Sequence, residues 1–420
     1  MSSPALKIML VAGEASGDKH GASLARALKG LSPGTRFEFF GSGGEEMRDA
    51  GVETLVDARD VAIMGIPEII RALGRLYGAY RRLILAAREK RPDVVVLIDW
   101  PDFNMRVARR LRKDGFKIVY YISPQIWAWR RYRVRAIRRD VDRMLVILPF
   151  EEDFYKREGV EVEYVGHPLA EAVRVSSSRE DFARRHGLDI SRPIIALLPG
   201  SRRKEIHYHL PELLDAAKRL GRVEIKSRAD ARVPSSGAAA SAPDFTGAAS
   251  LSRAPQFVVP LASTVDREQV ECILRRARAS GDGPLDVAFV ERDVYNALGH
   301  AEIAVVASGT ATVEAALVGT PMVIIYKGSE INWRLIRPLI HLDTFGMTNL
   351  IAGRRIVPEL MQGDVTGERI ASEVKAILSD AARLSRMRED LAEVRERLRN
   401  GEGRGPERAA RAVMRMIREG

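Results

Sequence analysis

The chain has 420 residues, of which 46% are hydrophobic and 29% are charged. This composition excludes a chain that is disordered throughout, a collagen-like chain and a disulfide-rich scaffold, and the length predicts two or three domains. Lys and Arg outnumber Asp and Glu by 67 to 56, giving a net charge of +11. The excess favours an anionic partner, which could be nucleic acid, a phospholipid surface or a phosphorylated substrate. The only cysteine, Cys272, excludes an internal disulfide and a multi-cysteine metal site.

Short apolar runs recur along the first part of the chain, and each is followed by a helical stretch. The runs cover residues 8–12, 36–40, 94–98, 117–122, 143–148 and 163–166. Amphipathic segments such as 21–29 and 103–113 lie between them. Continuous apolar runs that alternate with helices are typical of parallel strands buried on both faces. The pattern therefore predicts a doubly wound α/β domain.

A second series of apolar runs follows, with a helix expected at 210–219. These runs cover residues 194–198, 256–260, 286–290, 303–307 and 321–326. Two series predict two doubly wound domains, 1–168 and 169–365, which divide near the turn at His167 and Pro168. Residues 366–420 are charged and are predicted to be helical. Residues 226–255 are rich in Ala and Ser without apolar periodicity, which predicts a flexible surface insertion.

No apolar run reaches the 18–20 residues of a transmembrane helix, and the run at 8–12 is too short for a secretory signal. A cytoplasmic location is expected. The segment 61–77 carries an apolar stripe with arginines close to it, a pattern that resembles an interfacial helix, although an ordinary core helix is the alternative. The basic run 130–139 beside Trp127 and Trp129 suits nucleic acid, a membrane face or an acidic substrate.

Three loops between a predicted strand and a predicted helix contain glycine and small polar residues. The first, residues 13–18, includes Glu14 and Ser16 and ends in Gly17-Asp18. Backbone N–H groups at such a turn can bind a phosphate or a sugar hydroxyl. The loop does not match GxGxxG, and a tight turn without a ligand is the alternative.

The second loop, residues 198–205, contains Gly200, Ser201 and Arg202 after the first strand of the second domain. A Gly-Ser turn exposes backbone amides, and the guanidinium of Arg202 can bind a pyrophosphate through two N–H groups. The absence of GK[ST] excludes a Walker loop. A solvated basic turn is the alternative for Arg203 and Lys204.

The third loop, residues 307–316, places small hydroxyl residues at a helix start and a carboxylate one turn later. It contains Ser308, Gly309, Thr310 and Glu314. A carboxylate at this position can accept both hydroxyls of a ribose while the helix start faces a phosphate. Because open α/β sheets bind ligands at the carboxyl ends of their strands, the second and third loops together predict a nucleoside-diphosphate pocket.

Asp99 ends a wholly apolar run in the first domain, so its carboxylate is expected to be partly desolvated at the carboxyl end of a strand. Desolvation raises the basicity of a carboxylate towards that of a general base. Asp102 is expected to cap the following helix. His20, His167 and His300 are alternative bases, and no histidine spacing predicts a metal site.

Nine segments of the sequence resemble the lipid-A-disaccharide synthase family. They are GEASGD (13–18), MGIPEII (64–70), IDWPDFN (98–104), YYISPQIWAW (120–129), PFEEDFY (149–155), VGHPL (165–169), LPGSR (198–202), SGTATVEAAL (308–317) and TNLIAGRRIVPELMQ (348–362). They occur in order along most of the chain. The resemblance implies the GT-B fold, in which two Rossmann-like domains face a cleft and C-terminal helices return to the first domain.

The resemblance implies an inverting glycosyltransferase that uses no metal and no cofactor. The implied reaction moves 2,3-diacylglucosamine from its UDP conjugate to the 6-hydroxyl of 2,3-diacylglucosamine 1-phosphate, forming the β-1,6-linked lipid A disaccharide 1-phosphate and UDP. Asp99 corresponds to the base, Arg202 to the group that neutralises the diphosphate, and Glu314 to the ribose ligand. Asn349 is implied to line the UDP site, and Glu14 and Ser16 the acceptor side.

The implied substrates carry acyl chains, which favours a membrane-facing role for the stripe at 61–77, with Ile63, Ile66, Ile69 and Leu73 towards lipid. Peripheral attachment to the cytoplasmic face of the inner membrane of a Gram-negative cell is therefore expected, without nucleic acid as a partner, and a homodimer is expected. Residues 226–255 depart from the family pattern. Alternatives are another GT-B enzyme acting on a UDP-amino sugar, such as a UDP-N-acetylglucosamine 2-epimerase, and a basic RNA- or lipid-binding module.

Overall fold

The computed structural model describes residues 5–61, 66–226, 252–262, 265–279, 285–330, 333–334, 337, 344–399 and 405–419. For residues 60–61, 66–73, 129, 226 and 252 it describes the backbone alone. The chain forms two compact units, a first unit of Met1–Pro168 with Leu398–Gly420 and a second unit of Leu169–Arg397. Most of the predicted insertion, residues 227–251, lies outside the described residues.

The first unit is built on a seven-stranded parallel sheet with the order β3-β2-β1-β4-β5-β6-β7. Its strands are β1 (Leu6–Val11), β2 (Phe37–Gly43), β3 (Val52–Asp57), β4 (Val94–Ile98), β5 (Ile118–Tyr121), β6 (Arg143–Val146) and β7 (Val162–Tyr164). Its helices are α1 (Ala15–Leu31), α2 (Glu45–Asp49), α3 (Ala58–Val61), α4 (Ile66–Lys90), α5 (Pro101–Lys113), α6 (Ile126–Trp129), α7 (Val134–Asp140), α8 (Pro149–Arg157) and α19 (Gly405–Arg418), with a 3₁₀ turn at Arg131–Arg133.

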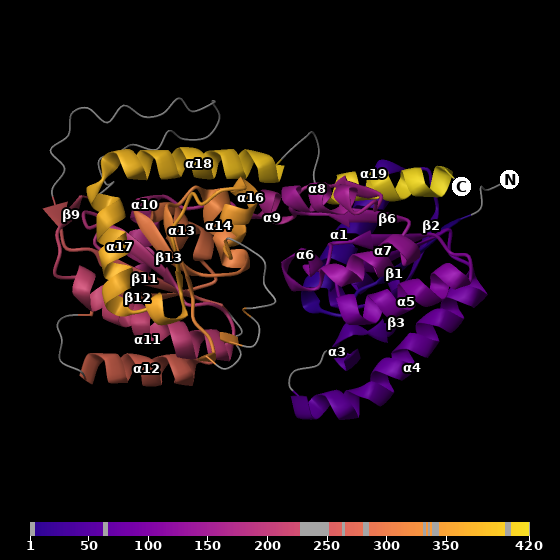
Figure 1. The fold of residues 1–420 in the computed structure, drawn as a ribbon, viewed down its shortest axis with the longest axis horizontal. Helices are drawn as coiled ribbons and strands as arrows, with labels where there is room; N and C mark the ends of the chain where they lie inside the picture. Colours follow the sequence, from indigo (N-terminus) through magenta and orange to yellow (C-terminus); the bar gives the residue numbers. More distant parts are fainter. Residues whose placement is uncertain are drawn as a thin grey trace. The chain divides into compact units, whose positions relative to one another are not determined.

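Helices cover both faces of this sheet, which accounts for the apolar run at residues 8–11 of β1 and for the wholly apolar sequence of β4 (Figure 1). On one face, α1 and α19 pack against each other, and their apolar sides meet β1 and β4 in one buried cluster. The other face is covered by α4 and α5. Every residue of β4 is fully buried, as expected for a strand that is enclosed on both sides.

The second unit repeats this plan around a six-stranded sheet with the order β12-β11-β8-β13-β14-β15. Its strands are β8 (Ile194–Leu198), β11 (Gln256–Leu261), β12 (Val287–Glu291), β13 (Ile303–Ala307), β14 (Met322–Tyr326) and β15 (Glu359–Met361), and a separate ribbon pairs β9 (Ile225–Lys226) with β10 (Ser252–Arg253). Its helices are α9 (Leu169–Ala172), α10 (Arg179–His186), α11 (Arg203–Leu220), α12 (Arg267–Ala279), α13 (Val294–His300), α14 (Thr310–Val318), α16 (Met347–Ala352) and α17 (Gly367–Ser379), with a 3₁₀ turn at Gln362–Asp364.

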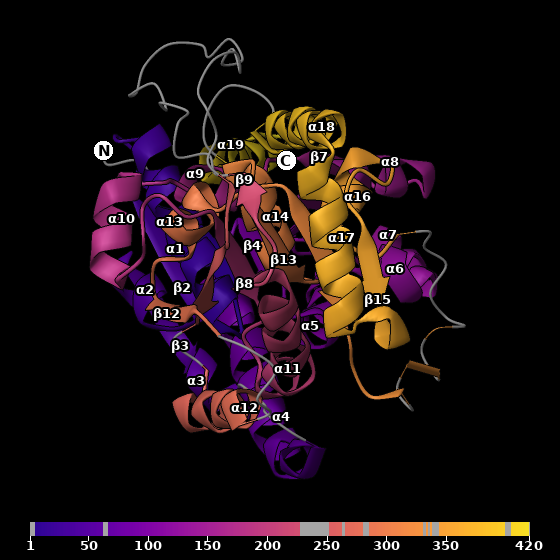
Figure 2. The same cartoon turned by 90° about the vertical axis from the view of Figure 1, so that its left-hand side faces the viewer.

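The sheet of the second unit is also enclosed by helices, with α11, α12 and α17 on one side and α13, α14 and α16 on the other (Figure 2). The C-terminal helices divide between the units. Helix α17 packs beside α11, and α18 (Ala381–Arg399) follows it to the boundary at Arg397, whereas α19 packs on α1 in the first unit.

Both sheets have the strand order of a Rossmann-type doubly wound fold, so the α/β prediction is confirmed. In each unit the first strand pairs with both the second and the fourth. The connections that follow these two adjacent parallel strands therefore run towards opposite edges of the sheet. The two strands are β1 and β4 in the first unit and β8 and β13 in the second. Such switch points are where open α/β sheets bind their ligands.

Candidate active site

The switch point of the first unit brings together Glu14 and Asp99, two residues predicted from separate motifs. Glu14 follows β1 and precedes α1, and Asp99 directly follows β4. Burial raises the pKa of the Asp99 carboxyl, and the negative charge of Glu14 raises it further, while a backbone N–H at Trp100 partly opposes both effects. A carboxylate with a raised pKa at the carboxyl end of a strand has the properties of a general base.

Trp100, the residue after Asp99, packs against Gly13 of the first loop. An ideal Cβ at Gly13 would lie 2.1 Å from Cδ2 of Trp100, so the indole ring rests on the bare backbone at this position. The other neighbour of the indole is the ring of Phe103, stacked at a centroid distance of 3.8 Å and an interplanar angle of 12°. Tyr80 of α4 meets Phe103 edge-on. A cluster of three aromatic residues, Trp100, Phe103 and Tyr80, therefore begins at the residue next to the candidate base Asp99.

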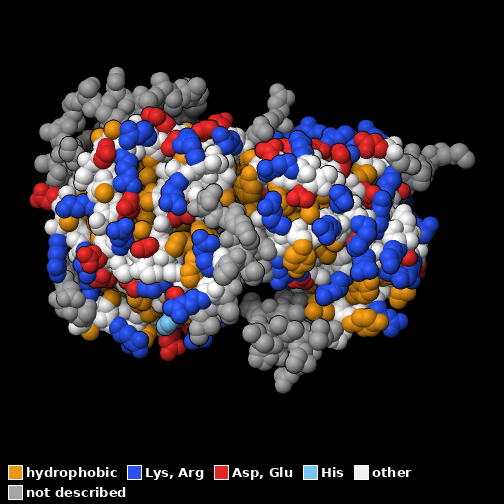
Figure 3. Space-filling view, viewed as in Figure 1, with side chains coloured by type: hydrophobic (Ala, Val, Ile, Leu, Met, Phe, Trp, Pro, Cys, Tyr) orange, Lys and Arg blue, Asp and Glu red, His pale blue; other side chains and the backbone are white. Residues whose placement is uncertain are grey.

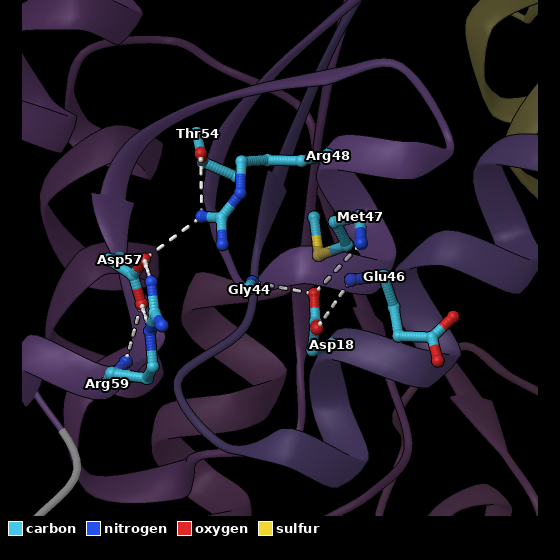
Figure 4. A network of polar contacts seen from close by, with 8 residues as sticks. All are labelled: Asp18, Gly44, Glu46, Met47, Arg48, Thr54, Asp57 and Arg59. Carbon is cyan, nitrogen blue, oxygen red and sulfur yellow. Dashed lines mark hydrogen bonds and ion pairs between the residues drawn. The ribbon is translucent and has the colours of Figure 1, made fainter.

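Of the remaining residues in the first loop, Ser16 is exposed in the first turn of α1, whereas Asp18 is buried and has a structural role. The Asp18 carboxylate accepts hydrogen bonds from the backbone N–H groups of Gly44, Glu46 and Met47 at the start of α2 (Figure 4). It satisfies amides that have no partner within the helix. The GEASGD segment thus places Glu14 and Ser16 at the surface and uses Asp18 to anchor the next loop.

The three histidines that were considered as alternative bases are unsuited to that task. Burial lowers the pKa of His20 to about 4, and burial together with the nearby His20 lowers that of His167 to about 4. Burial also lowers the pKa of His300, whose ring contacts the carbonyl of Ser177. An imidazole that resists protonation is a weak proton acceptor.

Asp102 does not cap α5, contrary to the expectation. The N-cap position is occupied by Trp100, and the Asp102 carboxylate instead contacts the guanidinium groups of Arg133 and Arg130. These ion pairs use part of the basic run at 130–139. Arg139 in the same run pairs with Asp140.

At the switch point of the second unit, the loop after β8 has a geometry that differs from the predicted one. Gly200 has a φ of +107°, and a Cβ there would lie 2.4 Å from the carboxylate of Glu205. This carboxylate accepts hydrogen bonds from the N–H groups of Ser201 (2.8 Å) and Arg202 (3.1 Å). The backbone amides that were predicted to be exposed are therefore bonded to Glu205. The Arg202 side chain is 84% exposed, and its Nη1 lies 3.3 Å from Oε1 of Glu205, so the guanidinium pairs with the same carboxylate while most of it stays accessible to a ligand.

The loop after β13 lies next to this one because β8 and β13 are paired. Ser308 is half-buried and bonded through its N–H to the carbonyl of Ile325, and Gly309 and Thr310 are exposed at the start of α14. Glu314 lies one turn further on. Burial raises the pKa of its carboxyl, and the hydroxyl of Tyr295 donates a hydrogen bond to Oε1 at 3.3 Å.

Asn349 lies in the first part of α16 and is fully engaged within the protein. Its Nδ2 donates to the carbonyl of Val357 and to Glu359, and its Oδ1 accepts from the N–H groups of Ile356 and Val357. These bonds use the two donor and two acceptor positions of the amide. The side chain of Asn349 therefore organises the loop before β15, and no hydrogen bond is left for UDP.

Sequence reasoning missed three residues that shape the second switch point: Glu205, Tyr295 and His209. The acidic residue three positions after Arg202 was a readable capping-box signal. Tyr295 comes from α13, and no local pattern relates it to Glu314. His209 joins two strand ends, because its Nδ1 contacts the carbonyl of Pro199 at 2.8 Å and its Nε2 accepts from the N–H of Lys327 at 2.9 Å.

The predicted membrane-facing residues cannot be placed. Ile63 lies outside the described residues, as do the side chains of Ile66, Ile69 and Leu73. Further along α4, Tyr77 and Leu85 are exposed apolar side chains. Lys and Arg side chains are scattered over the visible face of the first unit with acidic ones among them (Figure 3). Within the described parts of the chain, no helix has the length and apolarity to cross a membrane, and no three or more His, Cys, Asp or Glu residues are grouped as metal ligands.

The two doubly wound units with loops at both switch points define an α/β protein of the GT-B type, and solved structures of that type match the whole chain. One is the glycotransferase of kitacinnamycin, with a TM-score of 0.58 and 15% identity over 98% of this chain and 99% of that one. Another is the UDP-GlcNAc 2-epimerase from Neisseria meningitidis bound to UDP-GlcNAc, with a TM-score of 0.57 and 11% identity over 99% and 100%. At these identities the similarity shows the fold alone.

The sequence comparisons are more specific. The model of the lipid-A-disaccharide synthetase family matches residues 8–235 and 244–413. The lipid-A-disaccharide synthase of Koribacter versatilis is 43% identical over 97% of this chain and 98% of its own length, and that of Myxococcus xanthus is 43% identical over 99% and 98%. The chain belongs to the lipid-A-disaccharide synthetase family and is a glycosyltransferase. The resemblance found in the sequence is confirmed, and the epimerase and binding-module alternatives are not favoured.

Proposed function

We propose that this enzyme transfers 2,3-diacylglucosamine from its UDP conjugate to the 6-hydroxyl of 2,3-diacylglucosamine 1-phosphate. The acceptor oxygen attacks the anomeric carbon of the donor, the bond from that carbon to the diphosphate breaks, and the configuration inverts. The products are the β-1,6-linked disaccharide 1-phosphate and UDP. Family membership and the names of the relatives support this reaction.

Each unit supplies one part of the proposed chemistry. In the first unit, Asp99 takes the proton of the acceptor hydroxyl, and Glu14 and Ser16 line the acceptor side. In the second unit, Arg202 stabilises the charge that develops on the departing diphosphate, and Glu314 accepts the hydroxyls of the ribose. Ser308, Gly309 and Thr310, with the Gly200-Ser201 turn, form the surrounding wall. The proposal gives no hydrogen bond to the Asn349 side chain, which is used within the protein.

The observation that carries the proposal is that the two switch points, which have the same position in their sheets, present complementary chemical groups. The first presents the partly buried carboxylate of Asp99, and the second presents the exposed guanidinium of Arg202 and the partly buried carboxylate of Glu314 in the loops after two paired strands. Metal-independent transfer from a nucleotide sugar requires a base for the acceptor hydroxyl and a cationic side chain that binds the diphosphate.

A product assay tests the function. The purified enzyme is incubated with both acylated sugars, and the products are identified by mass spectrometry together with UDP release. We expect the disaccharide 1-phosphate and UDP only when both substrates are present. Release of UDP from the donor alone, or conversion of the donor to its C2 epimer without an acceptor, would contradict the proposal.

We further propose that the enzyme binds the cytoplasmic surface of the inner membrane, where substrates with acyl chains reside. The exposed Tyr77 and Leu85 on α4 support this proposal, together with the net charge of +11. In a vesicle-sedimentation assay with anionic phospholipid, the double variant Tyr77→Ser/Leu85→Ser is expected to bind less than the wild type. Ile190→Ser, which changes an exposed apolar residue of the second unit, is the control. Equal binding by all three proteins would place the membrane contact elsewhere.

A homodimer remains a prediction from the sequence, to be checked by light scattering.

A further inference from the structure

Two fully buried polar side chains of the first unit have no part in the proposed chemistry, yet both contact the residue that does. Tyr120 is in β5, the strand paired with β4, and Asn104 is in the first turn of α5. Burying a hydroxyl or an amide is unfavourable unless it forms hydrogen bonds. The partners of these two groups therefore indicate what the groups are for.

Both side chains donate to the same atom, the carbonyl oxygen of Asp99. The hydroxyl of Tyr120 lies 2.6 Å from this oxygen, and Nδ2 of Asn104 lies 2.8 Å from it. The same Nδ2 lies farther from the carbonyl oxygens of Ile98 (3.2 Å) and Val11 (3.4 Å). On the other side of the residue, the N–H of Asp99 donates to the carbonyl of Tyr121 at 3.1 Å. Both peptide groups that flank the Asp99 side chain are thus held by neighbouring elements.

This anchoring matters because the backbone at this point is in an unfavourable conformation. Asp99 has a φ of +48°, and Trp100 has a φ of +50° and a ψ of +59°. Residues with a Cβ rarely adopt this left-handed conformation, and two in succession persist only when the surrounding structure imposes them. The direction of the Asp99 side chain follows from the backbone that carries it. A relaxed turn would point the carboxylate elsewhere.

We propose that Tyr120 and Asn104 are positioning residues, which hold the left-handed turn at Asp99 and Trp100 and so aim the Asp99 carboxylate at the acceptor hydroxyl. The proposal rests on the role of Asp99 as the base. It also explains the IDWPDFN segment, because the Asn that ends the segment returns to the carbonyl of the Asp near its start. Neither residue touches the substrate in this account.

The test compares two buried tyrosines that each lose one hydroxyl. Tyr120→Phe removes the hydrogen bond to Asp99. Tyr155→Phe is the matched control, because its hydroxyl is bonded to Ser123 at 2.7 Å and its ring is equally buried. We expect Tyr120→Phe to lower kcat about 10- to 100-fold with the donor KM and the UDP dissociation constant unchanged, since misplacement of a reacting group affects the chemical step. Tyr155→Phe is expected to stay within about 3-fold of the wild-type kcat.

A second variant and a double variant separate positioning from general destabilisation. Asn104→Leu removes the other donor at similar volume and is expected to lower kcat in the same way. In the Asp99→Asn background, Tyr120→Phe is expected to add less than about a 2-fold loss, because residues that act as a unit are not additive. If Tyr120→Phe has the kcat of Tyr155→Phe, or if its effect persists in the Asp99→Asn background, the positioning role is wrong. Wild-type activity in Asp99→Asn alone would instead remove Asp99 as the base.

Discussion

The indole of Trp100 occupies the space that any side chain at residue 13 would need, because an ideal Cβ at Gly13 lies 2.1 Å from Cδ2 and 2.3 Å from Cε3 of the ring. Gly13 follows β1, and Trp100 follows β4, so the contact joins the two loops of the first switch point. The glycine in GEASGD is therefore required by a tertiary contact with IDWPDFN, in addition to any local need for a turn.

From this contact we expect Gly13→Ala to displace the indole and disturb the turn that carries Asp99. The added methyl group should destabilise the fold by about 1–3 kcal/mol, the usual effect of overpacking, and should reduce turnover at least 10-fold, because a small misplacement of a reacting group has a large kinetic effect. Thermal unfolding and steady-state kinetics measure the two effects. Gly78→Ala is the control. Its Cβ has nothing within 4 Å in α4, so this variant should be neutral or slightly more stable. Wild-type kinetics in Gly13→Ala would show that the indole can move without consequence.

The proposed role of Asp99 as the general base predicts a specific dependence on pH. Because burial and Glu14 raise the pKa of this carboxyl, the rate should fall as the pH decreases through a value above 3.9, the usual pKa of Asp. Asp99→Asn should reduce kcat at least ~100-fold, the effect of a lost general base, while UDP binding and the melting temperature are maintained.

A neighbouring variant checks the cause of this shift. Glu14→Gln removes the second contribution to the raised pKa, so the acidic limb of the kcat/KM profile should move to lower pH. Glu45→Gln, which changes an exposed carboxylate of α2, should leave the limb in place. A limb that is the same in all three proteins would assign the titration to another group.

The sequence predicted the strands of both sheets well, because each strand is a continuous apolar run between turn residues. It missed β3 and β15. Their alternating or short patterns, VETLVD and ELM, resemble the surrounding loops. Asp99 and Arg202 were selected as candidates from the local sequence, because Asp99 directly follows a buried strand and Arg202 follows a Gly-Ser turn. Their roles stay predictions.

Contacts between distant segments could not be predicted in this way. The bonds from Tyr120 and Asn104 to Asp99, and from Tyr295 to Glu314, depend on which strands and helices become neighbours. The bonds of Asn349 are a further example. Its motif was recognised, but an amide can bind a ligand or hold a loop, and the bonds that engage its side chain within the protein could not be read from the motif.

The exposed guanidinium in the second unit gives a prediction for nucleotide binding. Arg202→Ala should weaken UDP binding at least 10-fold by calorimetry and slow the transfer, because a hydrogen bond to a charged group contributes about 1.5–3 kcal/mol. Arg203→Ala, an exposed arginine at the next position, is the matched control and should bind UDP as the wild type does. Because the proposed function assigns the positive charge at the diphosphate to Arg202, activity should survive EDTA. Unchanged affinity in Arg202→Ala would make the LPGSR turn purely structural, and a loss in EDTA that magnesium restores would assign the diphosphate to a metal.

The last prediction concerns Glu151, a carboxyl buried at the start of α8. It accepts hydrogen bonds from Nε1 of Trp127 and from the N–H of Leu148, yet burial outweighs these bonds and raises its pKa to about 8. In the unfolded chain a Glu titrates near 4.3, so between about pH 4 and 8 the unfolded state loses this proton while the folded state keeps it. The contribution of Glu151 to stability is therefore complete below pH 4 and decreases as the pH rises to about 8.

The variant Glu151→Gln tests this prediction, because glutamine cannot ionise. Between pH 5 and pH 8 the wild type should therefore lose unfolding free energy relative to Glu151→Gln. The loss should reach up to a few kcal/mol, since one pKa unit corresponds to about 1.36 kcal/mol. Urea titrations at several pH values measure this shift. Glu152→Gln, which changes the partly exposed neighbour that pairs with Lys156, is the control without such a trend. A pH-independent difference for Glu151→Gln would mean that the buried carboxyl is ionised throughout this range.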